Sequence, residues 1–78
     1  MALSVMEIEG KIVSRLVERK KKDVAVLFLI ADDGREILLR QDRDSNFSLK
    51  DFTDHQVKVS GILEGRFFTP FEIADQVK

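Results

Sequence analysis

The sequence predicts a single, mainly β domain with five strands and one short helix between the third strand and the fourth. Three observations predict this fold class. Apolar and polar residues alternate over residues 56–63, which is the period of a half-buried strand. The dipeptide Asp33-Gly34 stands between two apolar runs and is a strong hairpin signal. Residues 48–52 have the residue spacing of a short helix.

The first strand is expected over residues 6–17. Its apolar residues keep one parity as far as Ile12 and change to the other parity at Val13. Because Gly10 stands beside this change, we expect a bend or bulge that lets one long strand serve two sheet faces. A polar connection over residues 18–23 follows.

The second strand is expected over residues 24–31, an uninterrupted apolar and β-branched segment that is too short for an ordinary helix. Both parities are apolar, so the pattern does not say which side faces inward. Phe28 is expected in the core. The chain then turns at Asp33-Gly34 and returns as a third strand over residues 36–40, antiparallel to the second.

A polar loop over residues 41–48 leads to the short helix. Ser48 can act as its N-cap, and Asp51 stands where the acid of a capping box belongs. The fourth strand over residues 56–63 is expected to point four residues inward, namely Val57, Val59, Gly61 and Leu63.

The end of the chain is expected to form a loop and a last strand. The loop covers residues 64–70. One parity of the last strand, over residues 71–77, is predicted to face inward; this parity comprises Phe71, Ile73, Asp75 and Val77.

This order of elements resembles the OB-fold, a small five-stranded Greek-key barrel. The resemblance covers about residues 6–77 of a single domain that spans residues 1–78. Three segments carry it: Gly10-Lys11-Ile12, residues 28–34, and Val57-Lys58-Val59-Ser60-Gly61-Ile62-Leu63, which looks like the V-x-V-x-G strand common in OB domains.

The resemblance implies a binding module, because OB-folds bind single-stranded nucleic acid, tRNA, oligosaccharide or other proteins. Two other folds stay open. An SH3-like barrel also has five strands but usually lacks a helix at this position. A ferredoxin-like α+β domain needs a second helix, and the pattern shows none.

Composition excludes several function classes. With 13 basic and 14 acidic residues the net charge is −1, which excludes a strongly basic protein that coats nucleic acid. The chain has no cysteine, so it has no disulfide and no cysteine zinc site. The only histidine, His55, stands in a polar hinge between the short helix and the fourth strand, where it is expected to be an exposed loop residue or to make a local backbone hydrogen bond. Asp32-Asp33 belongs to a turn. We therefore expect no enzymatic activity, no metal and no cofactor.

The chain is expected to be cytoplasmic and to make no contact with a membrane. Its first residues lack the basic and apolar regions of a signal peptide. Its longest apolar run, over residues 24–31, is far shorter than the roughly 20 residues that span a bilayer.

Two predicted loops contain the candidate site residues. Residues 11–22 hold six basic residues and one acidic residue, so positive charge is concentrated there. In OB-folds the loop after the first strand and the loop before the last flank the ligand face. Cations that neutralise phosphates and rings that stack on bases predict weak binding of single-stranded DNA or RNA. The residues are Arg19, Lys20, Lys21 and Lys22 of the first loop, and Arg66, Phe67 and Phe68 of the second.

A protein-interaction or homo-oligomeric assembly module is the alternative. It is suggested by the segment 24–31, because a barrel has one inside and the second apolar face of the central hairpin, formed by the second and third strands, needs cover from another chain. In that reading the basic residues only solvate a hairpin turn and discourage edge pairing.

Overall fold

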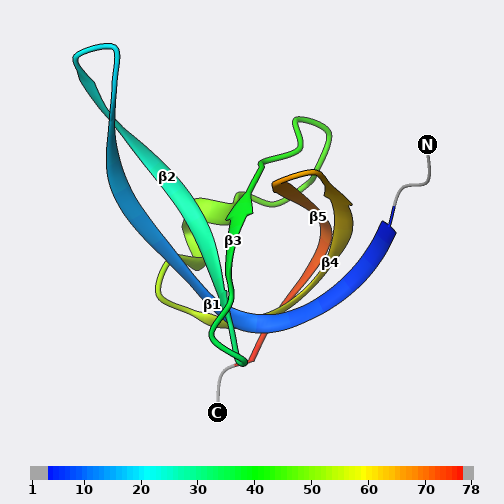
Figure 1. Cartoon of the computed structure of the whole chain (residues 1–78). Coiled ribbons are helices and arrows are strands. Elements are labelled where there is room, and N and C mark those ends of the chain that lie inside the picture. The colour runs from blue at the N-terminus through cyan, green and yellow to red at the C-terminus, as the bar shows by residue number, and fades with distance from the viewer. Residues whose placement is uncertain (1–3, 77–78) are drawn as a thin grey trace.

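The computed structural model describes residues 4–76, which form a closed five-stranded barrel (Figure 1). Around the barrel the strands follow the order β1-β2-β3-β5-β4. The elements are β1 (Ser4–Arg19), β2 (Lys22–Ala31), β3 (Glu36–Leu39), the 3-10 helix η1 (Leu49–Phe52), β4 (Gln56–Glu64) and β5 (Phe67–Asp75). The predicted fold class, mainly β with one short helical element between the third and fourth strands, is confirmed. No helix in residues 4–76 is long and apolar enough to cross a membrane.

The long first strand closes the barrel by changing partner at Gly10. Residues 4–11 of β1 pair with β4, and residues 10–19 pair with β2. A Cβ at Gly10 would collide with the carbonyl oxygen of Ile30 and lie 2.9 Å from the Cα of Ala31. The predicted bend is present in the curved course of β1 (Figure 1). Only glycine at position 10 lets β2 approach β1 so closely.

The core holds nine buried apolar residues drawn from all five strands and η1: Ile8, Ile12, Leu29, Ala31, Leu39, Leu49, Val57, Val59 and Phe68. Val59 is fully buried, as predicted. The prediction for Phe28 is wrong, because this ring is only partly buried and lies on the outer side of β2. Leu29 takes the inward position, since successive residues of a strand point to opposite faces.

The hairpin between β1 and β2 projects away from the barrel (Figure 1). Arg19 pairs with Lys22, so the connection is Lys20-Lys21 alone rather than the predicted residues 18–23. Polar residues can belong to the strands here, because the hairpin leaves the barrel and has solvent on both faces. Side chains on either face of the hairpin can therefore be polar.

The connection between β4 and β5 is also shorter than predicted. Glu64 pairs with Phe67 across Gly65-Arg66, and the positive φ of Gly65 (57°) suits the first position of a type II′ turn. The predicted loop over residues 64–70 is therefore wrong, since β5 starts at Phe67.

A register shift between Ser60 and Gly61 changes the parity of β5. Phe68 and Pro70 are buried before the shift, and Phe71 is 48% exposed rather than inward. Ile73 packs against the core as predicted. Asp75 is exposed, and Val77 lies outside the described residues.

The short helix η1 buries Leu49 and packs Phe52 against the core. Ser48 makes no side-chain cap, so the predicted capping box is absent. Gln41 holds this segment instead: its Oε1 accepts the Leu49 N–H at 2.7 Å and its Nε2 donates to the Phe47 carbonyl at 3.0 Å.

Candidate functional site

Three apolar residues stand side by side across the outer face of β2, β3 and β5. Phe28 pairs with Leu38, and Leu38 pairs with Phe67. Paired residues of neighbouring strands share one face. The residues that follow them along the strands, Leu29, Leu39 and Phe68, are buried in the core. The aromatic row, defined as Phe28, Leu38 and Phe67, therefore points outward.

An arginine side chain lies over each phenylalanine ring of the aromatic row. The Arg15 guanidinium lies 5.1 Å from the centre of the Phe28 ring, and that of Arg40 lies 5.8 Å from the centre of the Phe67 ring. Arg15 also forms an ion pair with Glu36 of β3. Both cations are within the distance of a cation–π interaction, so this face combines accessible rings with positive charge.

Two grooves meet at Leu38. The first, of about 290 Å³, lies between residues 24–27 of β2 and the side chains of Leu38 and Phe67, and Arg19 also lines it. The second, of about 460 Å³, continues past Phe28 to Arg66. Leu38 lines both grooves, so the two adjoin at this residue.

Four consecutive cations form the tip of the projecting hairpin: Arg19, Lys20, Lys21 and Lys22. None of them makes an ion pair with any residue between positions 4 and 76. The backbone of Lys20 (φ 49°) and Lys21 (φ 65°) is left-handed, as a type I′ turn requires.

Asn and Gly are the residues that a type I′ turn prefers, because they adopt positive φ with little strain. Lysine at both central positions places two charged side chains where the left-handed backbone favours Gly, Asn or Asp. Departures from local preference concentrate at functional sites. The hairpin tip is therefore a candidate for an electrostatic role.

The structure places three of the seven predicted site residues at the two grooves, three at the hairpin tip and one in the core. Arg19, Arg66 and Phe67 line the grooves. Phe68 is fully buried and cannot stack on a ligand, because it follows Phe67 and takes the inward position of β5. Sequence reasoning missed Phe28 and Arg40. Phe28 lies in a segment where both parities are apolar, so no signal in the sequence marked it as outward.

Comparison with known proteins does not indicate a function for this site. No family model, curated protein or solved structure matches the chain. The role of the outer face is therefore inferred from its residues and their geometry.

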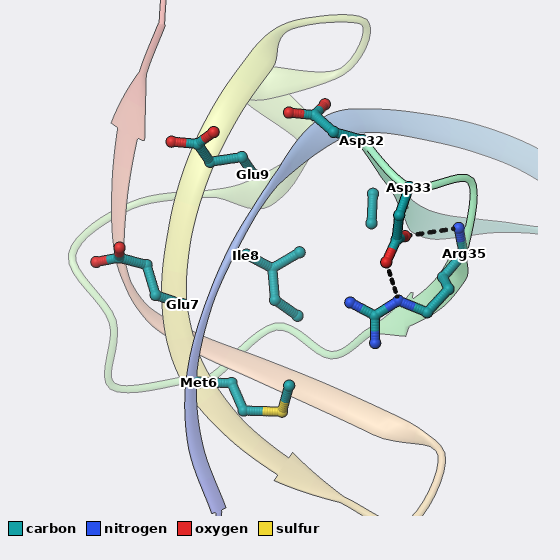
Figure 2. A pocket seen from close by; sticks show the side chains of 8 residues that line it. Met6, Glu7, Ile8, Glu9, Asp32, Asp33 and Arg35 are labelled. Atoms are coloured by element: carbon teal, nitrogen blue, oxygen red, sulfur yellow. Dashed lines mark hydrogen bonds and ion pairs between the residues drawn. The ribbon is translucent and has the colours of Figure 1, made fainter.

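An acidic pocket of about 390 Å³ lies beside β1 and the turn after β2 (Figure 2). The carboxylates of Glu7 and Glu9 lie on the opposite side of β1 from Ile8. Asp33 accepts hydrogen bonds from the Arg35 backbone N–H at 3.1 Å and side chain at 2.7 Å. The backbone hydrogen bond, with help from the Arg35 charge, holds the pKa of Asp33 below its ordinary value.

The acidic side chains of this pocket do not converge on a common point. Asp32 accepts a hydrogen bond from Gln56 Nε2 at 3.0 Å, so each aspartate of the turn has its own partner. No group of three or more His, Asp or Glu side chains in the described part of the chain could hold a metal ion. His55 Nδ1 pairs with Asp75 of β5 at 2.8 Å and fastens the segment before β4 to the last strand.

Proposed function

We propose that this domain is a non-enzymatic, OB-fold-like binding module that takes single-stranded DNA or RNA across its outer face. One observation carries the proposal: two phenylalanine rings with adjacent arginines lie on the outer face, and Arg19 of the hairpin tip lines a groove beside one of them. Proteins that bind single strands without sequence preference combine stacking rings with cations that follow the backbone.

The bases would stack on the aromatic row, and the phosphates would lie along the cations. Phe67 is 41% exposed and gives the larger platform. Arg40 and Arg15 can contact either a base plane or a phosphate, since guanidinium groups do both. Arg19 and Arg66, which line the two grooves, would neutralise phosphates together with Lys20, Lys21 and Lys22 of the hairpin tip.

Modest affinity follows from the charge distribution. The net charge of −1 provides no long-range attraction for a polyanion, so binding depends on the local cations. A single strand is favoured over a duplex because stacking on phenylalanine needs an unpaired base. We place this activity in the cytoplasm, where a chain without cysteine needs no oxidising conditions to fold.

Removal of the tip charges should flatten the salt dependence of binding. Three or four phosphate contacts predict a log–log slope of roughly −2 to −3 against salt, at about −0.7 per contact. The variant Lys20→Asn/Lys21→Gly/Lys22→Ser should flatten this slope by about 2 for every base sequence, without strain in the type I′ turn. Titration of labelled single-stranded oligonucleotides at several salt concentrations measures it.

The matched control removes three lysines that lie outside the hairpin tip, on β1, η1 and β4: Lys11→Ser, Lys50→Ser and Lys58→Ser. This control loses the same net charge, but at positions away from the proposed phosphate contacts. The salt dependence of its binding should therefore change by much less. Equal losses in both variants would contradict a site at the tip. Absence of binding at low salt, where electrostatic attraction is strongest, would reject the proposed function.

Removal of one ring should weaken binding without a change in slope. Phe67→Ala should reduce affinity by about 5- to 150-fold, which corresponds to roughly 1–3 kcal/mol for a stacked base. Phe71→Ala is the control, because Phe71 lies on the same strand with similar exposure but outside the aromatic row. Fluorescence anisotropy with the same oligonucleotides compares the two variants, and equal affinities would refute stacking on Phe67.

A role in protein interaction or homo-oligomeric assembly is the second candidate, and a different observation favours it. Leu16 and Val24 of the projecting hairpin are 73% and 42% exposed, on two strands that leave the barrel. These residues lie on the hairpin rather than in the aromatic row, so the two candidates do not exclude each other.

A further inference from the structure

The outer edge of β1 has no partner along the hairpin. β4 pairs with β1 only as far as Lys11, and among the described strands none continues along that edge over residues 13–19. An exposed strand edge presents a row of unpaired N–H and C=O groups that can pair with another strand. This edge is a docking surface that the barrel leaves open.

The backbone groups on this edge can be assigned residue by residue. Ile12 donates its N–H to the His55 carbonyl at 3.2 Å and accepts the Asp54 N–H at 2.6 Å, both on the side away from β2. In an antiparallel strand every second residue directs its N–H and C=O to the same edge. Pairing with β2 is unbroken from Gly10 to Arg19, so the alternation continues. Ser14, Leu16 and Glu18 therefore direct their backbone groups to the open edge.

We infer that a second copy of this chain occupies the edge and forms a two-fold symmetric, antiparallel β1–β1 dimer centred on Leu16. Leu16 is the midpoint of residues 13–19 and the most exposed large apolar residue in the described part of the chain, at 73%. Antiparallel pairing about Leu16 places it opposite its own copy and pairs Ser14 with Glu18. By symmetry the Ser14–Glu18 pair occurs twice, so there are three pairs. Each pair exchanges two main-chain hydrogen bonds, about six in total.

Charge complementarity favours a second copy over an unrelated strand. With Leu16 at the centre, the pairing ends with Arg19 of one copy opposite Val13 of the other. It goes no further, because His55 and Asp54 already pair with Ile12. Lys20, the residue after Arg19, then comes beside Asp54 of the other copy. Each hairpin tip therefore meets a carboxylate at the end of the opposite edge, and this contact occurs twice by symmetry. The inference deepens the assembly candidate and does not rest on nucleic-acid binding, because it uses the main-chain groups of β1 and leaves the other tip cations available.

The mass in solution tests the assembly. Light scattering at micromolar concentrations should give about twice the 9.0 kDa of one chain. Leu16→Lys should give the monomer mass, because it sets two cations against each other at the two-fold axis. Val5→Lys is the control, because Val5 is 67% exposed on the part of β1 that pairs with β4, and it should stay dimeric. A wild-type monomer up to about 100 μM would overturn the inference.

A single cysteine tests the register. Opposed residues of a hydrogen-bonded antiparallel pair have Cα atoms about 5.5 Å apart, within the range that a disulfide spans. The natural chain has no cysteine, so Leu16→Cys should form a symmetric disulfide dimer under mild oxidation. Val24→Cys, on the other strand of the hairpin, should stay unlinked. Cross-linking through Val24→Cys instead would overturn pairing through β1.

Removal of the carboxylate tests the charge contact. Asp54→Asn keeps a residue that tolerates the positive φ of this position (68°). An exposed ion pair changes an equilibrium by up to about fivefold, so the loss of both pairs should raise the dimer dissociation constant by up to about 25-fold. Asp51→Asn, on η1, is the matched control and should leave the constant unchanged. Equal effects of the two variants would refute the contact with Lys20.

Discussion

Phe68→Ala is expected to unfold a large part of the protein population near physiological temperature. Phe68 is fully buried and is the largest side chain in the core. Truncation of a core phenylalanine typically costs about 3–5 kcal/mol, because it removes apolar burial and leaves a cavity. A domain of this size is stable by roughly 4–12 kcal/mol. The melting temperature should fall by at least about 12 °C, at about 4–8 °C per kcal/mol.

Phe71→Ala is the matched control for this loss of stability. Phe71 is the same residue type on the same strand, but it is 48% exposed. Its truncation should change the free energy of unfolding by no more than about 0.5–1 kcal/mol. Thermal and urea denaturation followed by circular dichroism compare the two variants. Equal shifts would show that the inward and outward sides of β5 are assigned wrongly.

Gly10→Ala should be the second most damaging change. A Cβ at this position meets backbone atoms of Ile30 and Ala31, which cannot rotate away as a side chain can. The strands must separate where β1 passes from β4 to β2, and such overpacking costs about 3 kcal/mol. The expected fall in melting temperature is roughly 12–24 °C.

Gly34→Ala separates collision from backbone strain. Gly34 has a φ of 93°, and a Cβ there meets no atom within 4 Å. Its replacement should cost about 1 kcal/mol, from the left-handed backbone alone. Hydrogen exchange adds a local readout: Gly10→Ala should speed exchange on both sides of β1, whereas Gly34→Ala should affect only its hairpin. A larger loss for Gly34→Ala would contradict the close approach at Gly10.

The sequence by itself determined the elements and their order. Alternation over residues 56–63, the Asp33-Gly34 turn and the change of parity beside Gly10 are local patterns, and each reflects which backbone period can bury its apolar side. The concentration of cations at Arg19 to Lys22 was visible for the same reason. These features predicted five strands, a bent first strand and a basic tip.

Only the tertiary structure decided which side of each strand faces the core. In β2 both parities are apolar, so barrel closure alone placed Leu29 inside and Phe28 outside. In β5 a register shift reversed the parity, which buried Phe68 and exposed Phe71. A one-residue slip moves every side chain to the opposite face, and register depends on strands distant in sequence. The aromatic row is composed of such residues, so it emerged from the pairing of β2, β3 and β5 and not from any local motif.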